Sequence, residues 1–155
     1  MEHHYKTQIV WTGNKGSGTS HYTGYDRSHT LRIDHKIDIL ASSDKPFRGD
    51  DTKHNPEDFL LASLSSCHML WYLHLCADAG VIVWEYTDEA FGILKLEDGI
   101  GKFSNVDLNP QITVNAEEQI ELAIKLHHDA HQKCFIANSV NFPVEIFPTV
   151  KIKKD

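Results

Sequence analysis

Residues 55–80 read NPEDFLLASLSSCHMLWYLHLCADAG and contain the strongest structural signal in the chain. Asn55 is a favoured N-cap residue, and Pro56 suits the first helical position because that position needs no backbone N–H donor. No other proline or glycine occurs before Gly80, a residue type that commonly ends helices. The stretch therefore predicts one long helix that begins after Asn55 and runs to Ala79.

This predicted helix is apolar on nearly every side, so it must be surrounded by protein. The run over residues 59–77 also has about the length of a membrane span. Hydrocarbon tolerates polar side chains poorly, and the run is interrupted by Ser63, Ser65, Ser66, His68 and His74. We therefore expect a helix buried inside a folded protein or a dimer, and no membrane partner.

The segment before the helix predicts strands over residues 5–12, 19–25 and 30–34. A glycine-rich turn separates the first two strands, since glycine accepts positive φ at no steric cost. Residues 36–54 predict a polar loop. A loop of that length usually binds something or covers a site.

The segment after the helix predicts a β-hairpin, a second helix and a closing strand. The hairpin pairs residues 81–95 with residues 102–114. The second helix covers residues 115–133, and its inward stripe is Ile120, Ala123, Ile124, His127, His131 and Cys134. The closing strand, residues 144–152, is broken or confined to an edge by Pro148. This order predicts a single α+β domain over residues 1–155, with antiparallel sheets and two long helices.

Composition limits the partners and the state of the thiols. The 155 residues carry a formal net charge of −7, which argues against binding to nucleic acid or to an anionic membrane. No apolar secretory signal is visible at the start of the sequence. Three cysteines in such a chain predict reduced thiols in the cytoplasm rather than a disulfide framework. Any disulfide is expected to be transient and chemical.

Two of the cysteines are candidates for chemistry. Cys67 lies in the middle of the first helix, where an isolated cysteine usually behaves as a small apolar residue, and Cys76 is expected to be such a residue. Cys134 ends the second helix, whose inward face also carries His127 and His131. Because buried imidazoles need partners, these histidines are either satisfied core residues or the lining of a polar pocket.

These side chains are compatible with two kinds of chemistry. One is zinc binding, for which the available ligands are Cys67, His68, His131 and Cys134. Adjacent residues on a helix point about 100° apart and no C-x-x-C motif is present, so the metal signal is weak. The other is thiol redox chemistry, in which a thiolate reduces a peroxide and then condenses with a second cysteine. A nearby cation favours the thiolate, and the candidates are Arg48 and Arg27.

Together these features resemble the OsmC/Ohr family of hydroperoxide-reducing proteins, and the likeness covers almost the whole chain. The helix start NPE, with Cys67 ten positions after Glu57, is similar to the family's helix start and peroxidatic cysteine. Cys134, within KCFIANS, resembles the second cysteine near the end of the other long helix. Arg48 lies where the OsmC branch carries its catalytic arginine.

The resemblance implies an intertwined homodimer with its sites at the interface and with no metal or haem cofactor. Cys67 would be the peroxidatic nucleophile, and Cys134 would be the resolving thiol. An ion pair of Arg48 with Glu57 would orient the arginine toward the thiolate. Family members reduce organic hydroperoxides, and lipoyl proteins, as external dithiols, regenerate some of them. We expect the substrate pocket to be lined by His68, His127 and His131.

Helix geometry gives a separate reason to expect a site shared between chains. Glu57 and Cys67 are ten residues apart, which is about 15 Å along one helix. No proline or glycine lies between them to bend the helix. Glu57 and Arg48 would therefore serve the Cys67 of a partner chain. The simpler interpretation is that Glu57 only favours the helix N-terminus.

Two positions depart from the family pattern. His68 follows Cys67 where well-studied members carry phenylalanine, and Phe135 follows Cys134 where they often carry proline. The first departure puts a titratable ring next to the nucleophile, and the second changes the approach of the resolving thiol. We expect a thiol-dependent peroxidase that acts in oxidative stress defence. The alternative is an OsmC-fold protein that binds a small hydrophobic ligand, or serves in stress, without efficient peroxidase turnover.

Overall fold

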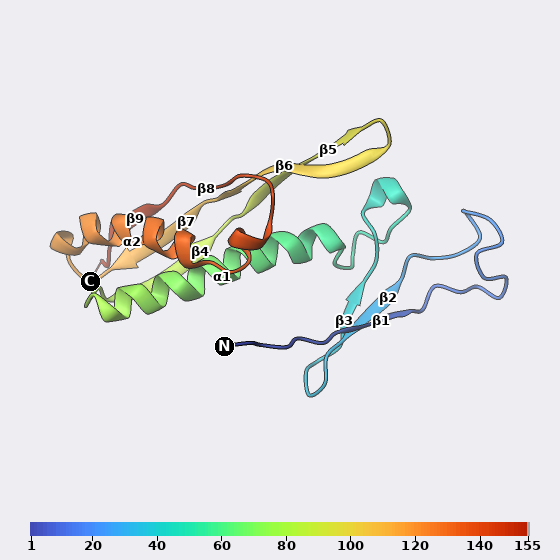
Figure 1. Cartoon of the computed structure of the whole chain (residues 1–155), viewed down its shortest axis with the longest axis horizontal. Coiled ribbons are helices and arrows are strands. Elements are labelled where there is room, and N and C mark those ends of the chain that lie inside the picture. Colours follow the sequence, from blue (N-terminus) through green and yellow to red (C-terminus); the bar gives the residue numbers. More distant parts are fainter. Residues whose placement is uncertain (155) are drawn as a thin grey trace. The chain divides into compact units, whose positions relative to one another are not determined.

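The structure is a computed structural model that describes residues 1–154 (Figure 1). The chain divides into two compact units, residues 1–59 and the rest of the chain, and each is described by itself. Both contain antiparallel sheet, and the longest helix runs from the end of the first unit into the second. The predicted α+β class is confirmed.

The first unit contains a three-stranded antiparallel sheet in the order β1-β2-β3. β1 (Gln8–Trp11) pairs with β2 (His29–Arg32), and β2 pairs with β3 (Ile39–Ala41). The strands predicted at residues 5–12 and 30–34 are therefore present in shorter form. β3 was expected to be loop; its short apolar run pairs with β2 and is followed by a 3₁₀ helix, η1 (Lys45–Phe47).

The strand predicted over residues 19–25 is wrong, because this segment forms turns. The guanidinium of Arg27 donates hydrogen bonds to the carbonyl oxygens of Tyr22 and Tyr25, each at 2.7 Å. It also lies over both tyrosine rings, 4.2 Å from each centroid. Carbonyl groups bound by an arginine are not available to a sheet ladder. The segment is therefore held as a loop by the Arg27 side chain.

The long helix α1 (Pro56–Asp78) begins where the sequence predicts and ends one residue earlier. Asn55 caps it: the backbone N–H of Asp58 donates to Asn55 Oδ1 at 2.8 Å, and the backbone N–H of Asn55 donates to the Asp58 carboxylate at 3.1 Å. This reciprocal pair satisfies donors near the helix start. At the other end, Gly80 has a φ of 73°, a left-handed conformation that glycine adopts without steric cost.

The predicted hairpin is present, but each of its arms is divided into two strands. β4 (Val83–Asp88) pairs with β7 (Pro110–Val114), and the pairing is antiparallel. β5 (Phe91–Glu97) pairs with β6 (Ile100–Leu108), again antiparallel. The hairpin therefore contributes to two different sheets.

Two C-terminal strands complete these sheets. β8 (Val144–Ile146) adds to β6, and β9 (Thr149–Ile152) adds to β7. The sheet orders are β5-β6-β8 and β4-β7-β9. Both added strands pair in parallel, whereas the sequence predicts antiparallel sheets. The chain reaches β8 and β9 only after α2, and such a long connection permits parallel strands. The predicted interruption at Pro148 is confirmed.

The second helix, α2 (Ile120–Lys133), starts later than predicted because a 3₁₀ turn, η2 (Glu117–Gln119), precedes it. Its buried residues are Ala123, Leu126, His127 and Ala130. The predicted stripe is partly wrong, since Ile124 is 46% exposed and Leu126 is 7% exposed. Packing against α1 and β7 sets the rotation of α2, and apolar spacing along a single helix does not reveal it.

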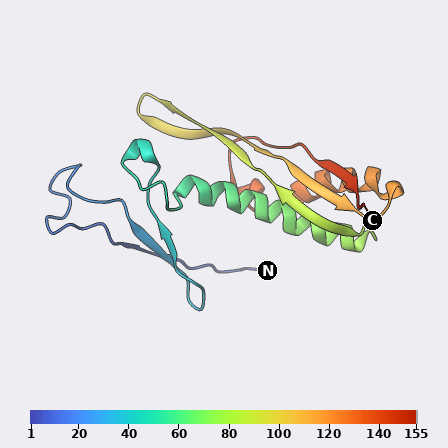
Figure 2. The same ribbon diagram turned by 180° about the vertical axis from the view of Figure 1, so that it is seen from behind.

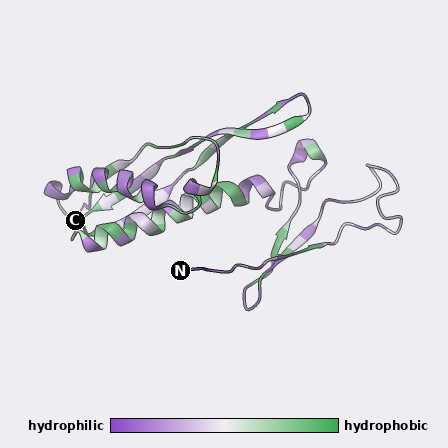
Figure 3. Cartoon of the chain, in the orientation of Figure 1, coloured by the Kyte–Doolittle hydropathy of each residue, from purple (hydrophilic) through white to green (hydrophobic). Residues whose placement is uncertain are grey.

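The core of the second unit lies between the two helices and the sheets. α1 contributes a stripe at four-residue spacing, made of Leu64, His68, Tyr72 and Cys76. Figures 1 and 2 show α1 and α2 along the same side of the β4-β7-β9 sheet, and one core cluster joins both helices to β7. The rest of α1 mixes apolar and polar residues, as the alternating colours of its ribbon in Figure 3 show, and Leu70 is 63% exposed. By length and composition α1 could also cross a membrane, and within this chain only its stripe of Leu64, His68, Tyr72 and Cys76 is buried.

The division of the hairpin is held by Asp88. Its carboxylate accepts the backbone N–H of Asn109 at 2.7 Å and also accepts the hydroxyl of Ser65 on α1. The Asn109 side chain in turn donates to the carbonyl oxygen of Glu89 at 2.9 Å. One carboxylate therefore joins both arms of the hairpin to the long helix.

Replacing Asp88 with alanine is expected to lower the free energy of unfolding by about 2–3 kcal/mol, because two donors lose a partly buried acceptor. Asp88→Asn should cost less, since the amide oxygen still accepts one of the two bonds. Chemical denaturation measures these differences, with the exposed neighbour Glu89→Ala as control. Equal losses for Asp88→Ala and Glu89→Ala would contradict this role of Asp88.

Candidate functional site

Two thiols meet at the contact between α1 and α2. Cys67 lies on α1 and is half-buried, whereas Cys134 is the C-cap residue of α2 and is only 1% exposed. Both are free thiols, and they lie close enough for their side chains to interact. The two cysteines that the sequence singles out are therefore neighbours in space.

The environments of the two thiols differ. Burial, and next the neighbouring Cys67 side chain, raise the pKa of Cys134 to about 11, although the backbone N–H of Ala137 donates to its sulfur at 3.4 Å. At neutral pH Cys134 is therefore protonated and shielded from solvent, and Cys67 is the more accessible thiol. This asymmetry suits a nucleophile that meets a dissolved oxidant and a second thiol that reacts with it from inside.

The third cysteine, Cys76, belongs to the core. It is 1% exposed and packs with Tyr72 in the cluster between the helices and β7. Burial raises the pKa of its thiol, and a buried protonated thiol is a poor nucleophile. Its surroundings are those of a structural cysteine.

Trp71 is a neighbour of the thiols that sequence reasoning missed. Its ring meets Phe135 edge-on with the centroids 5.6 Å apart, and Lys133 Nζ lies 5.6 Å from its centroid. Trp71 is one helical turn after Cys67 and Phe135 follows Cys134, so the four-residue spacing on α1 is the signal that could have found it. This contact is a second link between the helices beside the thiols.

His68 and His127 form a hydrogen-bonded pair in the core. His68 Nε2 and His127 Nδ1 lie 2.9 Å apart, and the side chains are 1% and 2% exposed. The His127 ring also stacks on Tyr72, with the centroids 3.7 Å apart. His68, which was expected on a pocket wall, is thus a core residue. The two imidazoles satisfy each other at these two nitrogens.

His131 is half-buried and lies beside a pocket of about 290 Å³. This pocket is lined by Ile124, His127, His128, His131, Val144, Ile146 and Pro148. His127 and His131 therefore share one pocket, and its lining does not include either thiol of the Cys67–Cys134 pair. The imidazole pocket lies between α2 and the β8 segment, whereas the thiol pair lies between α1 and the end of α2, so the two are distinct features.

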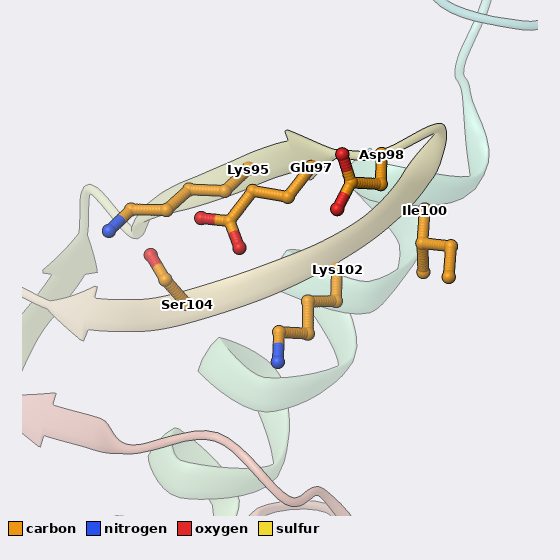
Figure 4. A pocket seen from close by; sticks show the side chains of 6 residues that line it. All are labelled: Lys95, Glu97, Asp98, Ile100, Lys102 and Ser104. Carbon is orange, nitrogen blue, oxygen red and sulfur yellow. The ribbon is translucent and has the colours of Figure 1, made fainter.

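Other parts of the second unit offer less chemistry. Within residues 1–154, no group of three or more His, Cys, Asp or Glu side chains is placed to hold a metal ion. The candidate zinc ligands are divided, because His68 bonds to His127 while the thiols face each other. A pocket of about 240 Å³ at the tip of the β5–β6 hairpin is lined by Lys95, Glu97, Asp98, Ile100, Lys102 and Ser104 (Figure 4). It offers charge without a thiol or an imidazole.

Three residues expected to act on the thiolate belong to the first unit, whereas the thiol pair belongs to the second. Arg48 is exposed and follows η1 with a φ of 65°. The expected ion pair between Arg48 and Glu57 is not formed among residues 1–154, where neighbouring lysines and aspartates pair instead. Arg27 is bound by its own loop. Their roles at Cys67 stay predictions.

Known proteins resemble this chain along nearly its whole length. The family model described as OsmC-like protein matches residues 49–147. The solved structure of an OsmC-like protein of unknown function from Vibrio cholerae is 33% identical, with a TM-score of 0.82, over 97% of this chain and 100% of that one. The uncharacterized protein YmaD of Bacillus subtilis is 22% identical over 98% of this chain and 96% of its own length.

A second solved structure is that of an organic hydroperoxide resistance protein from Elizabethkingia anophelis with thiocyanate bound. It is 22% identical, with a TM-score of 0.67, over 99% of this chain and 100% of that one. At this level of identity the likeness concerns the fold. Together with the Vibrio cholerae structure, it confirms the expected OsmC-like fold.

The buried imidazole pair predicts that acid destabilises the fold. Burial, with a smaller effect of His131, lowers the pKa of His68 to about 4; burial, with a smaller effect of His68, lowers the pKa of His127 to about 3. In the unfolded chain both titrate near pH 6.5. Between about pH 6.5 and 4 the unfolded state therefore binds more protons than the folded state, so stability is lost as the pH falls. The expected loss is on the order of 3 kcal/mol for each of the two histidines.

Urea denaturation across this pH window measures the effect. The double variant His68→Leu/His127→Leu should lose most of the pH dependence, because it removes both titrating groups. His74→Gln, at an exposed position on α1, is the matched control and should keep the wild-type slope. A wild-type slope in the double leucine variant would show that other groups cause the acid sensitivity.

Proposed function

This chain belongs to the OsmC-like protein family, and we propose that it is a thiol-dependent peroxidase that reduces organic hydroperoxides in oxidative stress defence. The observation that carries the proposal is the meeting of a half-buried Cys67 with a buried, protonated Cys134. Such a pair can pass through a sulfenic acid to a disulfide. The fold shared with a protein described as an organic hydroperoxide resistance protein supports the same class.

In the first proposed step, the Cys67 thiolate attacks an oxygen atom of the hydroperoxide. A sulfur–oxygen bond forms and the oxygen–oxygen bond breaks. The sulfur is oxidised to a sulfenic acid, and the remaining alkoxide takes up one proton and leaves as an alcohol. The accessibility of Cys67 relative to Cys134 is the reason for giving it this role.

In the second proposed step, Cys134 loses its proton and its sulfur attacks the sulfur of Cys67. A disulfide bond forms, the sulfur–oxygen bond breaks, and the hydroxyl group takes the proton and leaves as water. An external dithiol, such as a lipoyl protein, then reduces the disulfide by exchange and is itself oxidised. The cycle uses no metal or haem. Because it needs a supply of reduced dithiol, we propose a cytoplasmic location.

We further propose that Arg48 and Glu57 act on the thiolate of a partner chain in a homodimer. Ten residues of α1 separate Glu57 from Cys67, about 15 Å along the axis. α1 buries only one stripe within its own chain, and Leu70 on another face is 63% exposed. Pairing two copies of α1 in antiparallel orientation would cover such surface and bring each Glu57 toward the other chain's thiolate.

Cys134→Ser is expected to reduce about one equivalent of organic hydroperoxide per chain and then to stop, because the sulfenic acid has no partner thiol. Stopped-flow kinetics measures the single turnover, and mass spectrometry should find Cys67 as sulfenic acid and then in higher oxidation states. The matched control, Cys76→Ser, should turn over repeatedly and form the Cys67–Cys134 disulfide. Unchanged multiple turnover by Cys134→Ser would remove its resolving role.

A mixture of Glu57→Ala and Cys67→Ser, each expected to be inactive, tests the shared site. After joint unfolding and refolding, half of the dimers should be mixed, and each mixed dimer contains one complete site. About a quarter of the wild-type activity should therefore return. A mixture of Arg48→Ala with Cys67→Ser should recover the same fraction of the activity. Absence of recovery, or a monomer by ultracentrifugation, would defeat the shared site and leave the dithiol chemistry to the preceding test.

A further inference from the structure

One hydrogen bond joins the two helices that carry the thiols. It links His68 Nε2 on α1 to His127 Nδ1 on α2, which lie 2.9 Å apart. His68 directly follows Cys67, and His127 lies seven residues before Cys134, about two turns of helix. The bond is therefore tied to both of the backbone segments that present a thiol.

Packing restricts this pair to a narrow range of arrangements. The rings of His68 and His127 have centroids 5.2 Å apart with 15° between their planes. Tyr72 stacks on the His127 ring with 11° between the planes. Both imidazoles are almost fully buried, so a ring that turned away would leave a buried nitrogen without a partner, which is unfavourable.

We propose that His68 and His127 are positioning residues, which hold α1 and α2 in the register at which the two thiols meet. A slide of one residue moves a helix about 1.5 Å along its axis, and a 2.9 Å hydrogen bond does not keep its geometry through such a shift. Apolar contacts tolerate the shift better because they are not directional. The inference rests on the dithiol cycle proposed above, but it concerns only the closure of the disulfide.

The bond also depends on protonation. At least one of the two facing nitrogens must lack a proton, so the bond is lost when both rings are charged. The groups that face the pair are Tyr72 from α1, His131 from α2 and, through Tyr72, Tyr86 from β4. None of these groups is an anion at neutral pH, and the outer ring nitrogens have no partner among the described residues. Acid is therefore expected to separate the rings and, with them, the thiols.

The reduction potential of the Cys67–Cys134 disulfide tests the inference without any peroxide. Equilibration with glutathione buffers, read by mass spectrometry, measures how readily the protein brings the two sulfurs together. We expect His68→Leu and His127→Leu each to weaken closure about tenfold at neutral pH, which raises the potential by about 30 mV. His74→Leu is the matched control, since His74 is an exposed histidine of the same helix, and its potential should equal that of the wild-type protein.

The double variant His68→Gln/His127→Asn separates positioning from simple packing. The amide of glutamine reaches about as far as Nε2 of histidine, and the amide of asparagine about as far as Nδ1, so an amide–amide hydrogen bond can form. We expect this variant to recover the wild-type potential at neutral pH. Because amides do not titrate, the wild-type protein should close less well than the variant as the pH falls toward 3, where both imidazoles take up a proton.

Unchanged potentials in both leucine variants, or a folded amide variant that fails to recover closure, would overturn the inference. If substitutions at these positions unfold the protein, the wild-type potential alone decides. As the pH falls, the reduction potential should rise more steeply than the uptake of two protons by the reduced thiols requires. A pH dependence that corresponds to two protons only would reject the role of the histidine pair. A shifted potential in a protein that never reduces peroxide would keep this inference and reject the proposed peroxidase.

Discussion

One stripe of α1 packs against α2 and the sheets, and this packing organises the second unit. Tyr72 and Cys76 join the cluster shared with α2 and β7, while Leu64 packs with β6. Each large apolar side chain buried in this way stabilises the fold by about 1.5–3 kcal/mol. Because Cys67 stands on the adjacent face of the same helix, the packing that stabilises the unit also brings it to Cys134.

A polar pair inside this stripe changes what the core can do. Apolar side chains at positions 68 and 127 would bury more hydrophobic surface, but they would not define a single alignment of the helices. The bond between His68 and His127 is directional and fully buried, and polar contacts in a dry core favour one arrangement over its neighbours. The imidazole of His68 supplies a flat ring and also makes the interhelical bond. In our proposal, stability toward acid and closure of the thiols depend on the same two rings.

The two arginines considered as partners of the Cys67 thiolate differ in whether the guanidinium already has partners within the chain. The guanidinium of Arg27 donates to two carbonyl groups and lies over two tyrosine rings. Arg48 is exposed at the end of η1, and among residues 1–154 its side chain makes no ion pair. Its charge remains available to an anionic partner, which favours Arg48 over Arg27 for the proposed role beside Cys67. The backbone of Arg48 is left-handed, with a φ of 65°, where the 3₁₀ turn ends.

The sequence by itself determined the features whose causes are local: the capped start of α1 at Asn55, its end before Gly80, the hairpin and the interruption at Pro148. Capping, left-handed glycine and missing donors act within a few residues, so a reader of the chain can find them. The division of the hairpin at Asp88, the rotation of α2 and the bond between His68 and His127 follow from tertiary contacts. These join residues far apart in the chain. The two cysteines could be named from their contexts, but the difference between an accessible and a buried thiol comes from burial, which no local pattern encodes.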